Sequence, residues 1–357
     1  MQKLRAAIIG STGIAGQQFI SALENHEYFD IVALTASERN VGKKYLEAIK
    51  DANGKISWFS DNLPNERILN LVIQNSHELD LSKIDIIFSA VETEIAKDLE
   101  PFYAEKKPVF STASFFRYEN DTPLLIPAIN SNHLPLVRVQ QNNRNWKGFI
   151  LPIPNCTTTG FVSTLKPLVD NLDVDLAIMV SMQAVSGAGR INGVLALDII
   201  DNIIPFIPKE EEKVEKETKK ILGSILNDKI IENKIKISTT CTRVPVLDGH
   251  TEIANVKINS SYDLNTVINL YENYHNKDVD ELPSTPKKFF IIHKDPFRPQ
   301  PRLDRNVNDG MSISIGRIRN DNVLPGIKYV LLSHNTKLGA AKGAIWIAEL
   351  CKKFNYI

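Results

Sequence analysis

The sequence predicts an α/β protein with two domains: a doubly wound domain built on a parallel sheet, and an α+β domain with a mixed sheet. Its 357 residues suggest two domains at the usual size of roughly 150 residues each. Short apolar strands alternate with helical patterns in the first part of the chain, which implies crossover connections and a parallel sheet. Beyond Cys156 the strands are longer and follow one another with fewer helices, which favours a mixed sheet.

The first domain opens with a strand at 4–9 that runs into a glycine-containing turn. The helical pattern of Phe19, Ile20 and Leu23 follows that turn. A nearly continuous apolar run at 84–90 is typical of a strand buried on both faces. The other elements expected here are strands at 31–35 and 108–112 and a helix at 94–106.

The second domain is expected to combine a sheet with several helices. Its strands are predicted at 176–183, 234–243, 251–258, 289–293, 311–317 and 329–333. Helices are predicted at 194–204, 209–226 and 263–274, and a final amphipathic helix at 338–351. The segment 209–220 is dense in charges of both signs, and its simplest interpretation is a solvated helix face.

Composition excludes several classes of protein. Lys and Arg number 42, as do Asp and Glu, so the formal net charge is zero, which argues against a partner such as nucleic acid or an anionic membrane. Three cysteines make no disulfide framework and fit a reducing compartment. The apolar run before the first glycines is too short for a signal peptide, and no apolar run is long enough to span a membrane, so we expect a cytoplasmic protein. We expect no metal site.

The turn after the first strand contains three glycines, Gly10, Gly13 and Gly16. A strand that enters a helix through glycines lets backbone N–H groups approach a pyrophosphate at the helix N-terminus, as in Rossmann-type dinucleotide-binding domains. The spacing is G-x-x-G-x-x-G, not the usual G-x-G-x-x-G, so a tight turn that binds nothing is the alternative. The residues expected to contact a dinucleotide here are Gly10, Ser11, Thr12, Gly13 and Ile14.

The end of the second strand bears on the choice of cofactor. An acidic residue at this position usually binds the ribose 2′-OH of NAD, whereas Ser and Arg accommodate the 2′-phosphate of NADP. Ser37 and Arg39 therefore favour NADP, while Glu38 between them argues for NAD.

Cys156 lies in the run PNCTTTG (154–160), directly before an apolar helical pattern. At a helix N-terminus the dipole and the free N–H groups lower the pKa of a thiol and favour the thiolate. Thiolate nucleophiles suit aldehyde and acyl chemistry through a covalent intermediate. The alternative is an inert buried cysteine, which is what we expect of Cys241 and Cys351.

A third candidate segment contains an arginine and, seven residues later, a histidine: Arg243 and His250. A histidine beside a thiolate is its usual acid/base partner, and the alternative is a histidine on a surface turn. Arg243 could bind a carboxylate through two parallel hydrogen bonds, or it could pair with Asp248.

Taken together, these segments resemble the aspartate-β-semialdehyde dehydrogenase family, and its archaeal and fungal branch most closely. The resemblance extends from near residue 5 to near residue 350. It implies an NADP-binding domain at 1–155, completed by the C-terminal helix 335–357, and a catalytic and dimerisation domain at 156–334. The motifs that carry it are GSTGIAG (10–16), PNCTTTG (154–160), MQAVSGAGR (182–190), CTRVPVLDGHTE (241–252), FRPQPRLDR (297–305) and HNTKLGAAKGA (334–344).

The resemblance implies a role for each matching position. Cys156 matches the nucleophile, His250 the acid/base, and Gln183 the residue that orients the substrate carboxylate. Arg243 matches the residue that binds that carboxylate. The phosphate site is matched by Asn155 and Arg117. Glu210 matches the contact to the substrate amine, with Glu211 as an alternative, and Lys213 matches a further phosphate contact. The nicotinamide site is matched by Ser186, Gly187 and Asn335.

The activity implied is NADP-dependent interconversion of L-4-aspartyl phosphate and L-aspartate 4-semialdehyde plus phosphate through a cysteine thioester, in the biosynthesis of lysine, threonine, methionine and isoleucine. The alternative enzyme is a malonyl- or succinyl-CoA reductase on the same fold. A dinucleotide-binding regulator without catalysis is a third possibility. The resemblance also implies a homodimer or homotetramer that pairs through the open face of the second sheet.

Overall fold

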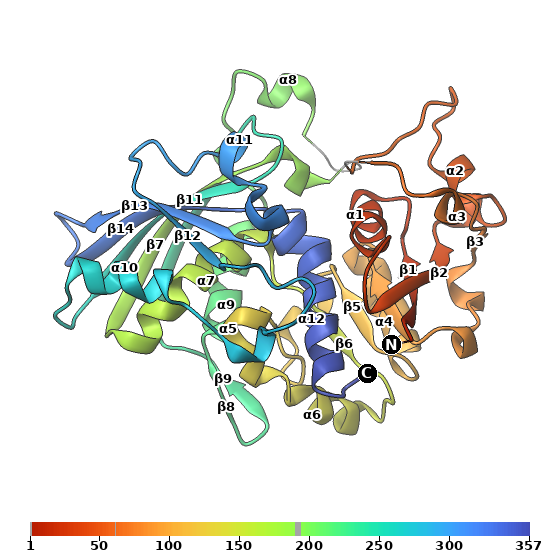
Figure 1. Cartoon of the computed structure of the whole chain (residues 1–357), viewed down its shortest axis with the longest axis horizontal. Coiled ribbons are helices and arrows are strands. Elements are labelled where there is room, and N and C mark those ends of the chain that lie inside the picture. Colours follow the sequence, from red (N-terminus) through yellow and green to blue (C-terminus); the bar gives the residue numbers. More distant parts are fainter. Residues whose placement is uncertain (1, 61, 190–193) are drawn as a thin grey trace. The chain divides into compact units, whose positions relative to one another are not determined.

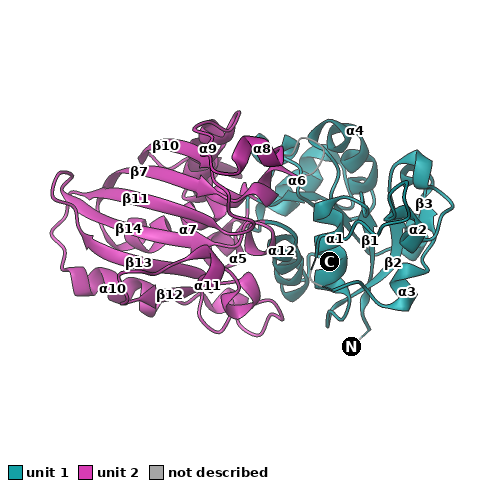
Figure 2. Cartoon of the chain, turned by 90° about the horizontal axis from the view of Figure 1, so that it is seen from above, with its two compact units in different colours: residues 1–124, 134–153, 340–357 teal, residues 125–133, 154–339 magenta. Residues whose placement is uncertain are grey.

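The computed structural model describes residues 2–60, 62–189 and 194–357, and the chain folds into two compact units. Unit 1 comprises residues 1–124, 134–153 and 340–357, and unit 2 comprises residues 125–133 and 154–339 (Figures 1 and 2). Residues 125–133 precede the range expected for the second domain, yet they pack in unit 2, where Tyr274 Oη donates to Ala128 O (2.9 Å).

Unit 1 is built on a six-stranded parallel sheet in the order β3-β2-β1-β4-β5-β6. Its strands are β1 (Leu4–Ile9), β2 (Phe29–Thr35), β3 (Ile73–Gln74), β4 (Ile86–Ser89), β5 (Val109–Ser111) and β6 (Ile150–Pro152). Its helices are α1 (Ile14–Leu23), α2 (Tyr45–Ala48), α3 (Glu66–Leu69), α4 (Thr93–Ala104), α6 (Leu136–Arg144) and α12 (Lys342–Lys353). The predicted doubly wound fold is thus confirmed, with strands β3 and β6 added to those expected.

The central strands of unit 1 are buried on both faces, as their unbroken apolar runs predict. On one face, Ile87 of β4 packs in a cluster with Leu99 and Tyr103 of α4. On the other face, the rings of Phe88 and Phe19 lie 5.1 Å apart. Such two-sided burial is typical of parallel sheets covered by helices.

Unit 2 is built on a six-stranded mixed sheet in the order β10-β7-β11-β14-β13-β12, which confirms the predicted mixed sheet. Its strands are β7 (Val174–Gln183), β10 (Lys236–Arg243), β11 (His250–Ile258), β12 (Phe290–His293), β13 (Ile313–Asn320) and β14 (Gly326–Ser333), with a separate hairpin of β8 (Ser224–Leu226) and β9 (Lys229–Ile231). Its helices are α5 (Pro127–Asn130), α7 (Cys156–Asn171), α8 (Ala196–Ile199), α9 (Glu210–Ile221), α10 (Leu264–Glu272) and α11 (Pro301–Asp304).

One face of this sheet is covered and the other is open. Helices α7, α9 and α10 pack on the covered face (Figure 2). Side chains of β7 alternate accordingly: Ala177 and Met179 are fully buried, whereas Ile178 and Val180 are 42% and 37% exposed. The open face therefore carries apolar side chains.

Two predicted helices of unit 2 are wrong in extent. Within 194–204 only α8 is helical, because Leu195, Leu197, Ile200 and Ile203 are all exposed and form no buried stripe to stabilise a longer helix. Within 209–226 the helix ends at Ile221, and 224–226 form strand β8. Asn227 and Asp228 both have positive φ, as a two-residue hairpin turn requires.

The C-terminal helix also differs from its expected range of 338–351. Lys337–Ala341 forms a separate wide turn, and the regular helix α12 begins only at Lys342. No helix in the described part of the chain is both long enough and apolar enough to cross a bilayer.

Candidate active site

Cys156 is the first residue of helix α7 in unit 2. The preceding Asn155 is the N-cap: its Oδ1 accepts hydrogen bonds from Thr157 N (2.9 Å) and Thr158 N (3.0 Å). Cys156 forms no disulfide and is partly exposed, whereas Cys241 and Cys351 are fully buried, as expected. Burial raises the pKa of Cys241 to about 12, which leaves Cys156 as the thiol suited to act as a nucleophile.

His250, the first residue of β11, is fully buried and faces this thiol. Its Nε2 lies 3.2 Å from Cys156 Sγ. Its Nδ1 accepts a hydrogen bond from Ala184 N (3.1 Å), so the ring proton is on Nε2 and points toward the sulfur. Burial, together with the nearby Arg243 and His334, lowers the pKa of His250 to about 3 and keeps the ring neutral. In this arrangement His250 is a hydrogen-bond donor to the sulfur.

Arg243, the last residue of β10, lies beside Gln183 of the neighbouring strand β7. Its Nη1 donates to Ala184 O (2.8 Å). The main chain of Ala184 therefore holds both residues, His250 through its N–H group and Arg243 through its carbonyl. The Arg243 guanidinium thus bonds a main-chain carbonyl and not Asp248, the alternative partner considered from the sequence. A Cβ at Gly187 would lie 3.1 Å from Arg243 Nη1, so a side chain there would crowd the guanidinium.

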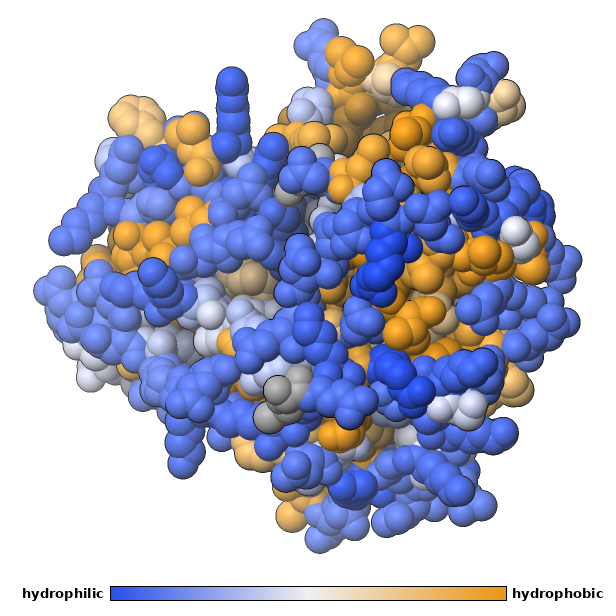
Figure 3. Space-filling view, turned by 45° about the vertical axis from the view of Figure 1, so that its right-hand side comes forward, coloured by the Kyte–Doolittle hydropathy of each residue, from blue (hydrophilic) through white to orange (hydrophobic). Residues whose placement is uncertain are grey.

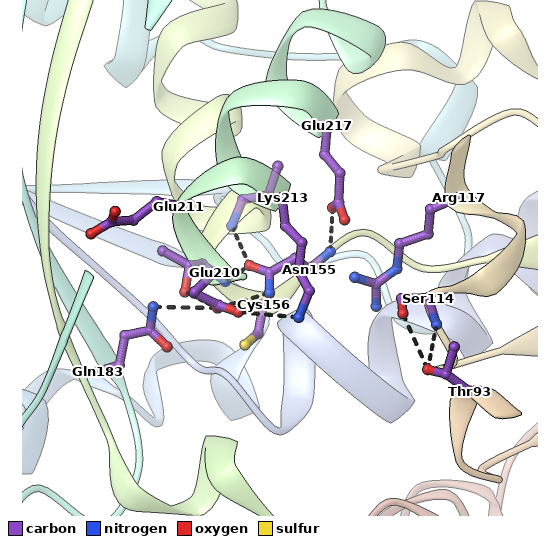
Figure 4. A network of polar contacts seen from close by, with 12 residues as sticks. Thr93, Ser114, Arg117, Asn155, Cys156, Gln183, Glu210, Glu211, Lys213 and Glu217 are labelled. Atoms are coloured by element: carbon purple, nitrogen blue, oxygen red, sulfur yellow. Dashed lines mark hydrogen bonds and ion pairs between the residues drawn. The ribbon is translucent and has the colours of Figure 1, made fainter. Parts of the chain in front are cut away.

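Helix α9 brings Glu210 and Lys213 to Asn155 and Gln183 (Figure 4). Glu210 Oε1 accepts from Asn155 Nδ2 (2.8 Å) and from Gln183 Nε2 (3.3 Å), and Lys213 Nζ lies 3.5 Å from Glu210 Oε2. The interpretation of 209–220 as a wholly solvated face is therefore wrong: one face of α9 is buried in the site.

The structure also distinguishes Glu210 from Glu211. The Glu211 carboxylate turns to the edge of the sheet, where its Oε1 accepts from Cys241 N (2.9 Å). Glu210 is the residue that meets Asn155 and Gln183.

The three residues of unit 2 expected near the nicotinamide also lie at the His250 turn. Asn335 Nδ2 donates to Ser186 Oγ (2.8 Å), and Asn335 Oδ1 accepts from Gly249 N (2.8 Å). A Cβ at Gly187 would lie 3.2 Å from His250 Cε1. Arg190, the last residue of the MQAVSGAGR motif, lies outside the described residues.

In unit 1 the glycine turn is built as the spacing predicts. Gly10 has φ +79°, and a Cβ there would lie 2.6 Å from Ala90 O. Helix α1 begins at Ile14 with Gly13 as an N-cap that offers no side chain to its N–H groups. Ser11 donates from both N and Oγ to Thr35 O (2.9 Å each), so this residue fastens the turn to the end of β2.

The remaining candidates of unit 1 lie after strand ends. Ser37 and Arg39 follow β2, and both are exposed, as is Glu38. Arg117 lies beyond β5, is 6% exposed, and donates from Nη2 to Thr112 O (3.2 Å).

Sequence reasoning missed two elements of this site. The main chain of Ala184, which orients His250 and Arg243, carries no side-chain signal. Glu217 is fully buried, and its Oε2 accepts from Asn155 N (2.6 Å). Its sequence signals are its place seven residues after Glu210, on the same face of a helix, and its position at the start of the family-like run ETKKIL (217–222), neither of which indicates the contact with Asn155.

Comparison with known families defines the class of protein. Two family models match: "Semialdehyde dehydrogenase, NAD binding domain" over residues 5–136, and "Semialdehyde dehydrogenase, dimerisation domain" over residues 165–338. The parallel-sheet unit and the thiol-bearing unit are thus the two parts of a semialdehyde dehydrogenase.

Individual relatives narrow the class. The chain is 44% identical over 349 residues to the aspartate-semialdehyde dehydrogenase of Archaeoglobus fulgidus, covering 97% of both chains. It is 40% identical to that of Candida albicans over the full length of both. The crystal structure of aspartate semialdehyde dehydrogenase with NADP from Candida albicans matches with a TM-score of 0.90 at 36% identity, covering 99% of this chain and all of that one. The chain belongs to the aspartate-semialdehyde dehydrogenase family.

Proposed function

We propose that the chain interconverts L-4-aspartyl phosphate with L-aspartate 4-semialdehyde and phosphate, using NADP, in the biosynthesis of amino acids derived from aspartate. The observation that carries this proposal is the Cys156–His250 pair, 3.2 Å apart at the start of α7. An acyl phosphate and an aldehyde are both electrophiles that a thiolate attacks.

The chemistry centres on Cys156. In the direction of reduction, its thiolate attacks the acyl carbon of the substrate, the C–O bond to phosphate breaks, and a thioester forms on Sγ. NADPH, when bound, supplies the hydride that reduces this acyl group to the aldehyde. As the aldehyde is released, the C–S bond breaks and its electron pair returns to the sulfur as the thiolate. The cysteine is therefore regenerated without any change in its own oxidation state.

His250 assists at the oxygen that becomes negative in these steps. Its Nε2–H group already points at Sγ, and an oxyanion on the carbon bound to Sγ would lie next to it. His250 therefore serves as the proton donor to this oxygen. The hydrogen bond from Ala184 N to Nδ1 keeps the ring in the tautomer that carries its proton on Nε2.

The substrate's charged groups are met by the polar residues around Cys156. Arg243 binds the carboxylate through its planar guanidinium, and Gln183 orients it. Glu210 takes the amino group, and Lys213, 3.5 Å from Glu210 Oε2, contacts the phosphate. Asn155 matches a phosphate contact of the family, and in unit 1 Arg117 matches another.

Both units offer groups that fit NADP. In unit 1 the N-terminus of α1 has no side-chain cap, and Gly10 leaves no room for a side chain, so the backbone can approach a pyrophosphate. The exposed Ser37 and Arg39 would meet the 2′-phosphate. In unit 2, Ser186, Gly187 and Asn335 would line the nicotinamide.

One assay separates the leading function from its alternative. We expect NADPH to form when aspartate semialdehyde, phosphate and NADP are mixed with the protein, and not to be consumed with malonyl-CoA. The CoA-reductase alternative is not favoured, because the relatives compared above carry the semialdehyde dehydrogenase name. A binding-only regulator would give no turnover with either substrate.

We also propose that the protein is a homodimer or homotetramer in the cytoplasm. One matching family model is a dimerisation domain, and the open face of the unit 2 sheet exposes Ile178, Val180 and Ile253. Hydrophobic side chains also lie among hydrophilic ones on the face drawn in Figure 3, so exposure alone does not single out the sheet. Light scattering at micromolar concentration tests this assembly, and a stable monomer would contradict it.

The proposed cytoplasmic location rests on the cysteines. None of the three forms a disulfide, which fits a reducing compartment.

A further inference from the structure

Asn155, the residue before the nucleophile, is held at three separate points. Its Oδ1 caps Thr157 N and Thr158 N, and its Nδ2 donates to Glu210 Oε1 (2.8 Å). The third point is its main-chain N–H group, which donates to Glu217 Oε2 (2.6 Å). These contacts together leave the residue that precedes Cys156 little freedom to move (Figure 4).

Two of the three points come from one helix. Glu210 and Glu217 are seven residues apart, which places both on the same face of α9, and both are buried. The Glu210 contact is to the side chain of Asn155, whereas the Glu217 contact is to its main chain. Of these two contacts, only the second holds the main chain of Asn155 directly.

Helix α9 is itself fastened to the sheet that carries the other site residues. Glu211 Oε1 accepts from Cys241 N (2.9 Å), and Glu215 Oε1 accepts from Thr239 N (3.2 Å). Both nitrogens belong to the edge strand β10, which also carries Arg243. Helix α9 is thus bonded both to β10, through Glu211 and Glu215, and to the start of α7, through Glu217.

We propose that Glu217 is a positioning residue that holds the Asn155 main chain, and thereby keeps Cys156 Sγ within reach of His250 Nε2. The proposal rests on Cys156 being the nucleophile of the proposed function. Its essential feature is a hydrogen-bond acceptor at the reach of a glutamate side chain, and the negative charge is secondary. Glutamine supplies the same acceptor without the charge, whereas aspartate keeps the charge but is one methylene shorter.

The kinetic test compares Glu217→Gln, Glu217→Asp and Glu217→Ala. We expect Glu217→Ala to lower kcat about 10- to 100-fold, the effect of a misplaced reacting group, with KM for the semialdehyde within about threefold. We expect Glu217→Gln to retain more of kcat than Glu217→Asp. Glu212→Gln, an exposed position on the same helix, is the matched control and should behave as the parent.

A second measurement does not depend on the substrate. Because Cys241 and Cys351 are fully buried, iodoacetamide should alkylate Cys156 selectively in the folded protein. In Glu217→Ala the pH of half-maximal alkylation should rise by about half a unit, since the thiolate loses part of its stabilisation at the helix start. In Glu217→Gln this pH should stay the same or fall.

The outcomes that overturn the proposal are specific. Should Glu217→Ala keep the parent's kcat and alkylation profile, Glu217 positions nothing. Should Glu217→Asp outperform Glu217→Gln, the charge and not the acceptor is what matters; this comparison remains decisive if the alanine variant does not fold. If the parent protein fails to turn over aspartate semialdehyde, the proposed function is wrong, while the alkylation profiles still test Glu217.

Discussion

Helices α1 and α7 both begin a few residues after a strand ends, but only α7 has an N-cap side chain that accepts hydrogen bonds from its first N–H groups. Helix α1 has Gly13 as its N-cap, so no side chain of its cap meets its N–H groups. Helix α7 has Asn155, whose side chain caps two N–H groups, and Cys156 as its first residue. The comparison teaches that a terminus without a side-chain cap leaves its N–H groups available to an external anion, whereas a capping side chain such as that of Asn155 occupies two of them.

The largest effect is expected at the α7 terminus. Cys156→Ser should lower kcat by at least about 10³-fold, because a serine hydroxyl neither ionises readily nor leaves readily. NADP binding, measured by fluorescence titration, should be unchanged because α1 is untouched. Cys351→Ala is a control that removes a buried thiol; residual turnover above a few per cent in Cys156→Ser would show that another group is the nucleophile.

His250→Asn should lower kcat about 10²-fold or more, with a modest change in KM for the semialdehyde. The asparagine cannot place an N–H group where Nε2 lies. Arg243→Lys is the matched comparison, because it keeps the charge but loses the planar fork, and it should mainly raise KM. Steady-state kinetics on both variants test this division, and identical defects would refute it.

The next effect concerns the cofactor and Arg39, which follows strand β2 of unit 1. Arg39→Ala should raise KM for NADP about 10-fold or more and leave KM for NAD nearly unchanged, because a charge-assisted contact to the 2′-phosphate is lost. Parallel titrations with the two cofactors measure the ratio. An equal loss with both would mean that Arg39 supports the local fold instead.

Gly13→Asn would give α1 the cap that α7 has. Its φ of −76° suits any residue, and a Cβ there would meet Gly10 O at an ordinary 3.6 Å. We expect KM for NADP to rise several-fold, because the new side chain competes with the pyrophosphate, while stability rises by only a few tenths of a kcal/mol. Thermal unfolding and cofactor kinetics report the two effects separately; unchanged cofactor kinetics would argue against a pyrophosphate at this terminus.

The smallest effect is a pH dependence of stability. The pKa of His250 falls from 6.5 to about 3 on folding, so between these values the unfolded chain binds more protons and acid favours unfolding. Lowering the pH from about 7 to about 5 should therefore reduce the free energy of unfolding of the parent by about 1–2 kcal/mol more than it reduces that of the His250→Asn variant. Urea unfolding of both proteins at the two pH values measures this difference, and equal losses would show that His250 is already protonated or exposed.

The sequence predicts best where local chemistry decides the structure. The glycine turn, the thiol at the start of a helix and the apolar central strands all follow from neighbouring residues, and the structure contains each of them. The helix expected at 194–204 fails because its apolar residues stay exposed, which only tertiary packing determines. The Glu217 contact joins residues 62 positions apart, and the Ala184 contacts use the main chain, so neither has a local signature.

Gly339 has a consequence for any attempt to re-engineer this chain. A Cβ at this residue would lie 2.9 Å from Cys156 Cβ, and Gly339 is the last residue of unit 2 before the chain returns to unit 1 at Ala340. A second of the four crossings between the units, from Ile153 of unit 1 to Pro154 of unit 2, lies directly before Asn155 and the start of the helix that carries Cys156. Junctions between domains are ordinarily the places that tolerate inserted linkers, affinity tags or new chain ends. Here two of the four junctions adjoin the residue that carries the reactive sulfur, so a tag or a permuted terminus is better placed at the β8–β9 hairpin tip around Asn227.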